Sequence, residues 1–348
     1  MDKKPTIMDV ARHSGVSIST VSLALNAKPG VSEETRARVF NVASELGYAP
    51  KITAAPGARA ELNTVGMIVK VDPDQQPQAN PFYSKVIVGI EDACRRKGIN
   101  LLFSGLPVDK DNCPVEIPTM LTSNLVDGLL MVGAFVDETI LSMEDNHTNA
   151  PIVLVDGYSN TQSFDAVVSD NFRAAYQAVE YLVHKGHRHI GLIGGEKNAY
   201  PSLLERRNGY LRALKDNGLT ESYNANFNIN QSHGEEQTIA LLQKNPHLSA
   251  LFCINDDVGV TAIQAAQSLG RRIPADLSVI GYDNTYIAAH AHPPLTTMHV
   301  DTLAMGRAAV QLLALRVENA DSARMTLTIH PTLVERGSVG PAQARPPA

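Results

Sequence analysis

Seven short apolar runs, separated by stretches long enough to form helices, constrain the fold of this chain more than any other feature. They are VGMIVK, NLLFSG, DGLLMVG, PIVLVDG, HIGLIGG, ALFCIND and LSVIGYD. Strands that are apolar throughout and alternate with helices are typical of parallel sheets covered on both faces. Because the pattern repeats after about residue 160, we predict an α/β body of two doubly wound parallel-sheet lobes, with a ligand between them at the carboxyl ends of the strands.

Short polar side chains end several of these predicted strands. Asp156 follows PIVLV, Asn255 and Asp256 follow ALFCI, and Asp283 follows LSVIGY. Carboxylates and amides that converge from strand ends can form paired hydrogen bonds with the hydroxyl groups of a small polar ligand. Asp156 or Asp256 alone could equally cap the next helix or turn. For the set as a whole, we favour a ligand site.

The first 50 residues contain start and stop signals for three short helices. We expect these helices at about 6–13, 17–25 and 32–47, with Thr6, Ser17 and Ser32 as their capping residues. Thr6 followed by Asp9 resembles a capping box. Two helices joined by a tight turn at Gly15, with a third helix behind them, have the spacing of a helix-turn-helix headpiece.

The second of these helices has two different sides, since successive residues turn by about 100°. We expect one side to pack and the other to face outward. The packing side is Ser17, Thr20, Val21, Ala24 and Leu25, and the outward side is Ile18, Ser19, Ser22, Leu23 and Asn26. Serine and asparagine can bond base edges, and isoleucine or leucine can contact a thymine methyl group. The alternative, a fully buried helix, would place three polar residues together in a small core, so we predict a recognition helix.

The distribution of charge agrees with a DNA-binding head. Residues 1–60 carry eight Lys/Arg and five Asp/Glu, a net charge of +3 within a total of −6, which leaves −9 for the rest of the chain. A small basic head on an acidic body is typical of a polyanion-binding module joined to a domain with another task.

The run TIMDVARHSGVSISTVSLALN, followed by VSEETRARVFNVASELGYAP, resembles the headpiece of the LacI/GalR (lactose-repressor/galactose-repressor) family of bacterial transcription regulators. The resemblance implies that Ile18, Ser19 and Leu23 read bases, with Ser22 and Asn26 beside them. Many relatives have arginine at the Leu23 position, which implies a different preferred operator here. The residues that match phosphate-bonding positions are Thr6, Ser17, Thr20, Ser32, Thr35 and Tyr48.

The resemblance continues through the body to about Arg336, in segments such as NPFYSKVIVGIEDA, LLERRNGYLRAL and IPADLSVIGYDNT. It implies a periplasmic-binding-protein-like fold. The matches to effector-contacting positions of sugar-responsive members are Asp156, Arg206, Asn255 and Asp283, and Phe82 and Tyr83 match the aromatic edge of that site. Arg206 would be the anchor, because its planar fork can grip paired hydroxyls, a carboxylate or a phosphate.

The predicted function is a cytoplasmic transcription regulator, most simply a repressor, that binds double-stranded operator DNA as a homodimer and responds to a small effector. A sugar is the first candidate for the effector, with a purine or a phosphorylated sugar behind it. A free solute-binding protein would explain the body but not the head or the missing signal peptide. An enzyme is not expected, since no catalytic constellation or nucleotide-binding glycine motif is found, and neither a cofactor nor a membrane segment is predicted.

We expect a headpiece at 1–50, a hinge linker at 51–63, an effector-binding and dimerisation body at 64–336 and a disordered tail at 337–348. The chain would cross between the lobes near 160–168, 292–298 and 318–324. In the family, a hinge leucine wedges into the minor groove of DNA, but that position is Gly57 here, preceded by Pro56. Both are poor helix formers, so we expect no wedge; a short helix from Pro56, a flexible linker and insertion of Leu62 stay open.

Three histidines near the start of one predicted strand raise the question of a metal. His184, His187 and His189 lie in HKGHRHIG without a nearby cysteine, and we expect no carboxylate to converge on them, so no metal site is predicted. The three cysteines of the chain lack CxxC spacing, which favours a reduced protein without disulfides.

Overall fold

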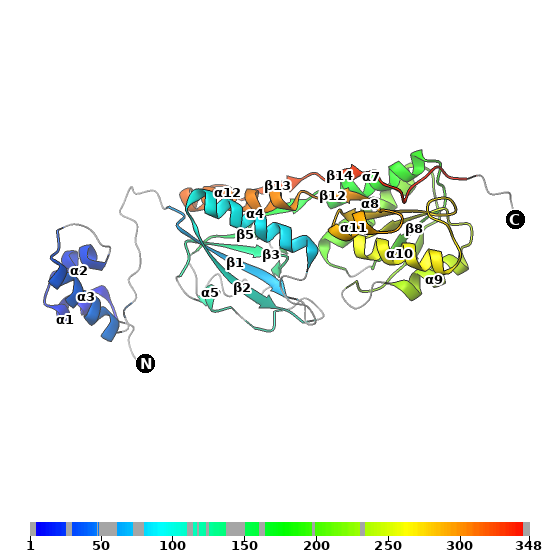
Figure 1. Cartoon of the computed structure of the whole chain (residues 1–348). Coiled ribbons are helices and arrows are strands. Elements are labelled where there is room, and N and C mark those ends of the chain that lie inside the picture. The colour runs from blue at the N-terminus through cyan, green and yellow to red at the C-terminus, as the bar shows by residue number, and fades with distance from the viewer. Residues whose placement is uncertain are drawn as a thin grey trace. The chain divides into compact units, whose positions relative to one another are not determined.

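The computed structural model divides the chain into two compact units, Met1–Ala60 and Glu61–Ala348, which we call the head and the body. The structure describes residues 5–25, 30–46, 48, 61–71, 80–109, 114–116, 118–122, 125–136, 150–159, 164–196, 199–229 and 234–343. Most of their helices and strands are labelled in Figure 1. Within these residues, no helix is both long and apolar enough to cross a membrane.

Three short helices form the head, as predicted: α1 (Ile7–Ser14), α2 (Ile18–Leu25) and α3 (Glu33–Glu45). Gly15 makes the turn between the first two with a φ of 68°, a conformation that costs glycine little. Val21 and Ala24 are buried in the core of the head, as expected. Ser17 is exposed instead of packed, because its hydroxyl caps α2 by accepting from the Thr20 backbone N–H at 3.1 Å.

The body contains two six-stranded sheets, and we call the first sheet with its helices the N lobe. In sheet order its strands are β13 (Thr326–Ile329), β7 (Asp165–Ser169), β5 (Ile152–Val155), β3 (Gly128–Val132), β1 (Thr64–Val71) and β2 (Asn100–Pro107). All neighbouring strands run parallel. The short pair β4 (Phe135–Val136) and β6 (Tyr158–Ser159) adds a small second sheet.

Alternate residues of the N-lobe strands bury two apolar faces. Met67 and Leu130 face the packed helices α4 (Pro81–Lys97) and α12 (Thr302–Glu318). Ile68 and Leu129 lie on the opposite face, where α5 (Thr119–Thr122) contributes Leu121. Burial on both faces explains why the central strands β1, β3 and β5 are apolar throughout and show no alternation.

The other six-stranded sheet and its helices form the C lobe. In sheet order its strands are β14 (Thr332–Val334), β12 (Thr296–His299), β11 (Ser278–Asp283), β10 (Ala250–Cys253), β8 (Ile190–Ile193) and β9 (Tyr223–Ala225), and only the pairing of β12 with β14 is antiparallel. The helices are α7 (Asn171–His184), α8 (Pro201–Asp216), α9 (Glu235–Lys244), α10 (Asp256–Ser268) and α11 (Tyr286–His290). The predicted fold class, a helix-turn-helix head and a two-lobed, mostly parallel α/β body, is confirmed.

The two lobes have the same strand order next to their first strands. The first strand of the lobe lies between the second and the third: β1 between β2 and β3, and β8 between β9 and β10. The winding therefore reverses beside β1 and beside β8. In such sheets, ligands bind at the carboxyl ends of the strands, next to this reversal.

The chain crosses between the lobes three times, later than predicted each time. The crossings fall between β7 and α7, between β12 and α12, and between β13 and β14, at about residues 170, 300 and 330. The predicted segments 160–168, 292–298 and 318–324 are therefore wrong. The reason is that β7, β12 and β13 are completed before the chain leaves their lobe.

The disordered tail predicted at 337–348 is wrong for residues 337–343, which pack on the C lobe. The buried Ser338 hydroxyl donates to the Val279 carbonyl at 2.6 Å and accepts from the Thr296 N–H at 2.8 Å. The Ala342 N–H donates to the Lys185 carbonyl at 2.8 Å. Residues 344–348 lie outside the described residues.

Most of the hinge predicted at 51–63, including Pro56 and Gly57, also lies outside the described residues. The described part begins at Glu61, and Leu62 is partly buried against the core of the body. The backbone N–H groups of Asn63 and Thr64 both donate to the Asp127 carboxylate at 2.8 Å. These contacts fix the start of the body.

Candidate functional site

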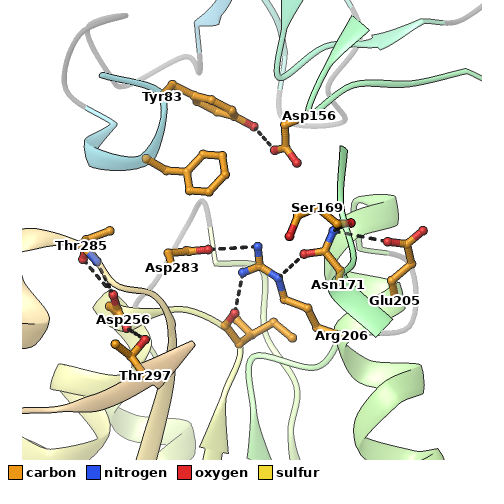
Figure 2. Close-up of polar contacts among 12 residues, drawn as sticks. Tyr83, Asp156, Ser169, Asn171, Glu205, Arg206, Asp256, Asp283, Thr285 and Thr297 are labelled. Carbon is orange, nitrogen blue, oxygen red and sulfur yellow. Dashed lines mark hydrogen bonds and ion pairs between the residues drawn. The ribbon is translucent and has the colours of Figure 1, made fainter. Parts of the chain in front are cut away.

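Polar side chains from both lobes meet at the carboxyl ends of the two sheets. Asp156 follows β5 and Tyr83 lies in the first turn of α4, both in the N lobe, whereas Arg206 in α8 and Asp283 at the end of β11 belong to the C lobe. Figure 2 shows Tyr83 and Asp156 facing the pair formed by Asp283 and Arg206. The structure thus brings together five of the six residues predicted to bind an effector, because Phe82 packs against Tyr83.

Arg206 is held rigidly at the centre of the C-lobe half of the site. It is only 4% exposed, and its Nε donates to Asn171 Oδ1 at 2.9 Å. One terminal nitrogen donates to the Ile254 carbonyl at 2.8 Å, and the other lies 3.0 Å from Asp283 Oδ1. The guanidinium carbon lies 3.8 Å from the centre of the Tyr282 ring. A guanidinium fixed on three nitrogens can orient a ligand without losing rotamer freedom.

Asp156 forms the N-lobe half of the site together with Tyr83. The Tyr83 hydroxyl donates to one Asp156 oxygen at 3.0 Å, and the ring of Phe82 meets that of Tyr83 edge-on at 5.3 Å. Gly133, with a φ of 70°, leaves room for Tyr83, because a Cβ at this position would lie 2.6 Å from the Tyr83 ring. The second Asp156 oxygen is buried and has no hydrogen-bond partner among the described residues.

The carboxyl groups of the site are destabilised in their charged form. Burial raises the pKa of Asp156 to about 6, although the charge of Arg206 opposes the change. Burial also raises the pKa of Asp283, again against Arg206. Both residues have a positive φ, 47° for Asp156 and 100° for Asp283, which is rare outside glycine and tends to occur at functional sites. Hydrogen bonds from ligand O–H or N–H groups would stabilise the charged form of these carboxyl groups.

Asn255 and Asp256 play a different part from the other strand-end residues. The Asn255 side chain accepts from the Val258 N–H at 2.9 Å and so caps α10, which is the alternative considered for this class of residue. Asp256 is fully buried and accepts from the backbone and hydroxyl of Thr285 and, at 2.6 Å, from the Thr297 hydroxyl. Asp256 therefore connects the start of α10 to the N-cap of α11 and to β12 within the C lobe.

Sequence reasoning missed four polar residues of the site: Asn171, Glu205, Tyr158 and Tyr200. The Asn171 amide nitrogen and the Tyr158 hydroxyl both lie 3.3 Å from Glu205 Oε2. The Tyr200 hydroxyl, from the C lobe, lies 3.1 Å from the carbonyl oxygens of Ala134 and Asp156 in the N lobe. The available signals were weak: Glu205 precedes Arg206, and Asn171 lies two residues after the end of β7.

The predicted DNA-contacting residues lie mainly at the start of the head helices and on the outer side of α2. Ile18 is 48% exposed, Ser19 is exposed, Ser22 and Leu23 are half-buried, and Asn26 lies outside the described residues. The hydroxyl residues matched to phosphate positions cluster at helix N-termini, which attract anions: Thr6 at α1, Ser17 and Thr20 at α2, and Ser32 and Thr35 at α3. Tyr48 packs against the core of the head.

The three histidines considered for a metal have separate surroundings. His187 is buried, and its ring nitrogens lie 3.0 Å from the Ser249 hydroxyl and 3.1 Å from the Gly340 carbonyl. His184 is exposed at the end of α7. His189, however, lies beside Glu221 and His247. The expectation that no carboxylate converges on these histidines is therefore wrong for His189.

A helix-turn-helix head joined to a two-lobed body with a polar site between the lobes defines a ligand-responsive DNA-binding protein. Residues 6–51 match the family described as bacterial regulatory proteins, lacI family, and residues 179–339 match the periplasmic binding protein-like domain. The chain is 32% identical over 336 residues to the HTH-type transcriptional repressor PurR of Aliivibrio salmonicida (strain LFI1238), covering 96% of this chain and 98% of that protein.

Two solved structures are similar over most or all of the body. The transcriptional regulator CelR in complex with cellobiose is 27% identical, with a TM-score of 0.66 over 96% of this chain and 99% of that one. A LacI family transcriptional regulator from Enterococcus faecium with bound ribose is 25% identical, with a TM-score of 0.67 over 81% of this chain and 100% of that one. The chain belongs to the LacI family of bacterial regulatory proteins. It is a DNA-binding transcriptional regulator with a ligand-binding body.

Proposed function

We propose that this regulator acts in the cytoplasm as a homodimeric repressor, and that an uncharged polar effector, a sugar, bound between the lobes sets its affinity for operator DNA. The buried Asp156 oxygen without a partner among the described residues, opposite the ion pair of Arg206 and Asp283, carries this proposal. A buried acceptor without a donor is costly. A ligand hydroxyl at this position would supply the donor.

The charge of the site favours an uncharged ligand over a phosphorylated one. Asp156, Asp283 and Glu205 all lie close enough to Arg206 to interact with its charge. A phosphate would meet these three carboxyl groups and a guanidinium already held by Asp283. A sugar offers several O–H donors, and the edge-on aromatic pair of Phe82 and Tyr83 offers a surface for the apolar face of its ring. The cellobiose and ribose in the two similar structures support the same choice.

The effector is tested by calorimetric titration of the full chain with monosaccharides, disaccharides, phosphosugars and purine bases. We expect one sugar to bind, with Asp156→Asn and Arg206→Lys each weakening it by about tenfold or more, as expected for hydrogen bonds to charged groups. Asp216→Asn, in an exposed pair with Arg212, is the control and should not change the affinity. A ligand whose affinity resists both site substitutions would overturn the site, and a purine that depends on Asp156 would replace the sugar.

The outer side of α2 supports direct reading of bases, with the hydroxyl groups at the helix starts bonding phosphates. Leu23→Arg should change the operator sequence selected from a random pool, since side chains in the major groove discriminate by ~1–3 kcal/mol per base contact. Thr35→Ala should weaken all sequences alike, since phosphate contacts carry no sequence information. An unchanged selected site in the Leu23→Arg variant would remove Leu23 from the base-reading set.

A homodimer is expected because one recognition helix contacts too few base pairs to be selective. A dimer contacts two half-sites about one helical turn apart on the DNA. We expect a dimer in sedimentation and a near-palindromic footprint. A monomer with a single, unsymmetrical half-site would contradict the proposal.

The linker sequence supports a weaker central kink in the operator than a leucine wedge produces. Gly57 stands at the wedge position, and Leu62, the rival wedge, is packed against the core of the body. Circular-permutation mobility of the bound operator measures the bend. A sharp bend that disappears in Leu62→Ala would show that Leu62 leaves the body to insert into DNA.

A further inference from the structure

A cluster of metal-binding side chains lies on the C lobe, away from the effector site. It consists of His189, Glu221 and His247, all exposed, with their ligand atoms within 4.8 Å of one another. The Tyr223 hydroxyl lies in the middle of the cluster, 2.9 Å from His247 Nε2 and 3.3 Å from His189 Nδ1, and it donates to the Glu221 carboxylate. We call these four residues the histidine cluster.

The strand order of the C lobe creates this cluster. His189 directly precedes β8, Glu221 precedes β9 by two residues and His247 lies just before β10. These strands are parallel neighbours, with β8 in the centre, so their amino ends share one edge of the sheet. The backbone there is fixed, since the His189 carbonyl accepts from the N–H groups of Ser249 and Ala250 at 3.0 and 3.3 Å. The effector site occupies the opposite edge, at the carboxyl ends.

We propose that the histidine cluster binds one transition-metal ion of the zinc class, with the two imidazoles and the Glu221 carboxylate as ligands. Two imidazoles and one carboxylate suit zinc and its neighbours, whereas magnesium and calcium prefer oxygen ligands alone. Tyr223 or solvent occupies the fourth position of a tetrahedral ion.

The spacing of the cluster is close to what zinc requires. Ligand atoms at about 2.1 Å from a tetrahedral zinc are roughly 3.4 Å apart. The present atoms lie within 4.8 Å of one another, so a shift of about an ångström closes the gap. The side chains are exposed and can make this shift by small rotations. The backbone hydrogen bonds between the strands keep their Cα atoms in place. His189 Nδ1 and His247 Nε2 already approach one point, the Tyr223 hydroxyl, at 3.3 and 2.9 Å.

The test is calorimetric titration of the full chain, purified without a polyhistidine tag and treated with a chelator, with zinc chloride near neutral pH. We expect one zinc per chain, and a loss of affinity of at least about tenfold in both His247→Gln and His189→Gln. His184→Gln is the matched control, because His184 is equally exposed but lies outside the cluster, and its affinity should be unchanged. Magnesium chloride should not bind at this site.

A second readout separates a metal site from loss of folding. Cobalt(II) in a tetrahedral nitrogen and oxygen site absorbs visible light, so the full chain should show this absorption and the His247→Gln variant should lose it while keeping its circular dichroism spectrum and its effector affinity. No uptake of zinc, or uptake that is the same in His247→Gln and His184→Gln, would overturn the proposal and leave the cluster as a hydrogen-bonded surface patch.

Discussion

Two buried arginine–aspartate pairs, one in each lobe, share their chemistry and differ in their surroundings. In the N lobe, Arg316 bonds both oxygens of Asp165, at 2.6 and 3.0 Å, and also the backbone carbonyls of residues 320, 322 and 323. The Met325 N–H donates to the same carboxylate at 2.8 Å. In the C lobe, Arg206 is paired with Asp283, but the nearby Asp156 keeps a buried oxygen without a partner among the described residues.

The charged form is favoured at Asp165 and disfavoured at Asp156 and Asp283. Burial alone would raise the pKa of Asp165, but the hydrogen bonds from Arg316 and Met325 outweigh it and hold that pKa below its ordinary value. Burial dominates at Asp156 and Asp283 and raises both pKa values. The Arg316–Asp165 pair is therefore complete and structural, joining α12 to the strand before the first crossing, whereas the site between the lobes lacks donors that a ligand can provide.

The largest effect that this comparison predicts is on stability in the N lobe. Asp165→Asn leaves the Arg316 charge buried without its counterion, and breaking such a pair costs about 3–5 kcal/mol. We expect the free energy of unfolding of the body, measured by urea denaturation near neutral pH, to fall by this amount, while the effector affinity of the folded protein stays the same.

Asp216→Asn is the control for this substitution, since the Arg212–Asp216 pair is exposed and one helical turn apart. It should cost about 0.5 kcal/mol or less. If Asp165→Asn is equally mild, the buried pair of the N lobe is not the structural anchor that its hydrogen bonds suggest.

The second predicted effect is a gain in the free energy of unfolding, and it comes from Asp156 in the site between the lobes. Asp156→Asn removes a carboxylate that is buried at a cost, so the free protein should gain up to about 2–3 kcal/mol at pH 8, because each tenfold change in an acid's dissociation constant on folding corresponds to about 1.4 kcal/mol. The same variant should bind the effector more weakly. Urea denaturation measures the gain in stability, and calorimetry measures the loss of effector affinity. A variant that is less stable than the parent protein would mean that Asp156 is already satisfied.

The pH dependence of stability distinguishes the two aspartates. The pKa of Asp156 in the folded protein, about 6, lies above that of an unfolded aspartate, about 3.9. Between these values the folded state binds the extra proton, so this group lowers stability as pH rises from about 4 to 6 and has no further effect above that range. Asp165, whose pKa is lowered, contributes stability above its unfolded pKa and loses it as pH falls.

Denaturation of the parent protein and Asp156→Asn across this range isolates the first contribution. The difference between them should grow from near zero at pH 4 to its full size above pH 6. A constant difference would place the pKa of Asp156 outside this window.

The fold was largely predictable, because parallel strands buried on both faces must be apolar throughout and so leave a clear pattern. The head was predictable for a similar reason, since capping residues such as Ser17 and turn residues such as Gly15 act locally. The packed tail was not, because the bonds of Ser338 to β11 and β12 join residues about 60 and 40 positions apart, respectively. Composition indicates disorder there, and tertiary contacts decide otherwise.

The site was predictable only in part, for the same physical reason. Residues that end strands converge in a doubly wound sheet, so this position pointed to Asp156 and Asp283, but it pointed equally to Asn255, which caps α10. Asn171 accepts from Arg206 and donates to Glu205, and His247 meets His189 only because β10 lies next to β8. Such contacts depend on strand order, which a strand pattern does not reveal.

The smallest effect concerns the hydrogen bond that the Tyr83 hydroxyl donates to the Asp156 carboxylate. Tyr83→Phe removes the donor at 3.0 Å, and a hydrogen bond of this kind contributes about 1 kcal/mol. The bond to Tyr83 also lowers the pKa of Asp156, so the variant should raise that pKa further. The loss of stability should therefore be larger above pH 6, where Asp156 is charged, than at pH 4.5.

Tyr210→Phe is the matched control: its buried hydroxyl donates to the Ile190 carbonyl at 2.8 Å, a neutral acceptor, so its cost should not depend on pH. Urea denaturation of both variants at the two pH values decides the matter. If the costs of the two substitutions are equally independent of pH, then Asp156 does not titrate in the site, and the contrast between the complete pair of the N lobe and the open site beside Arg206 loses its electrostatic basis.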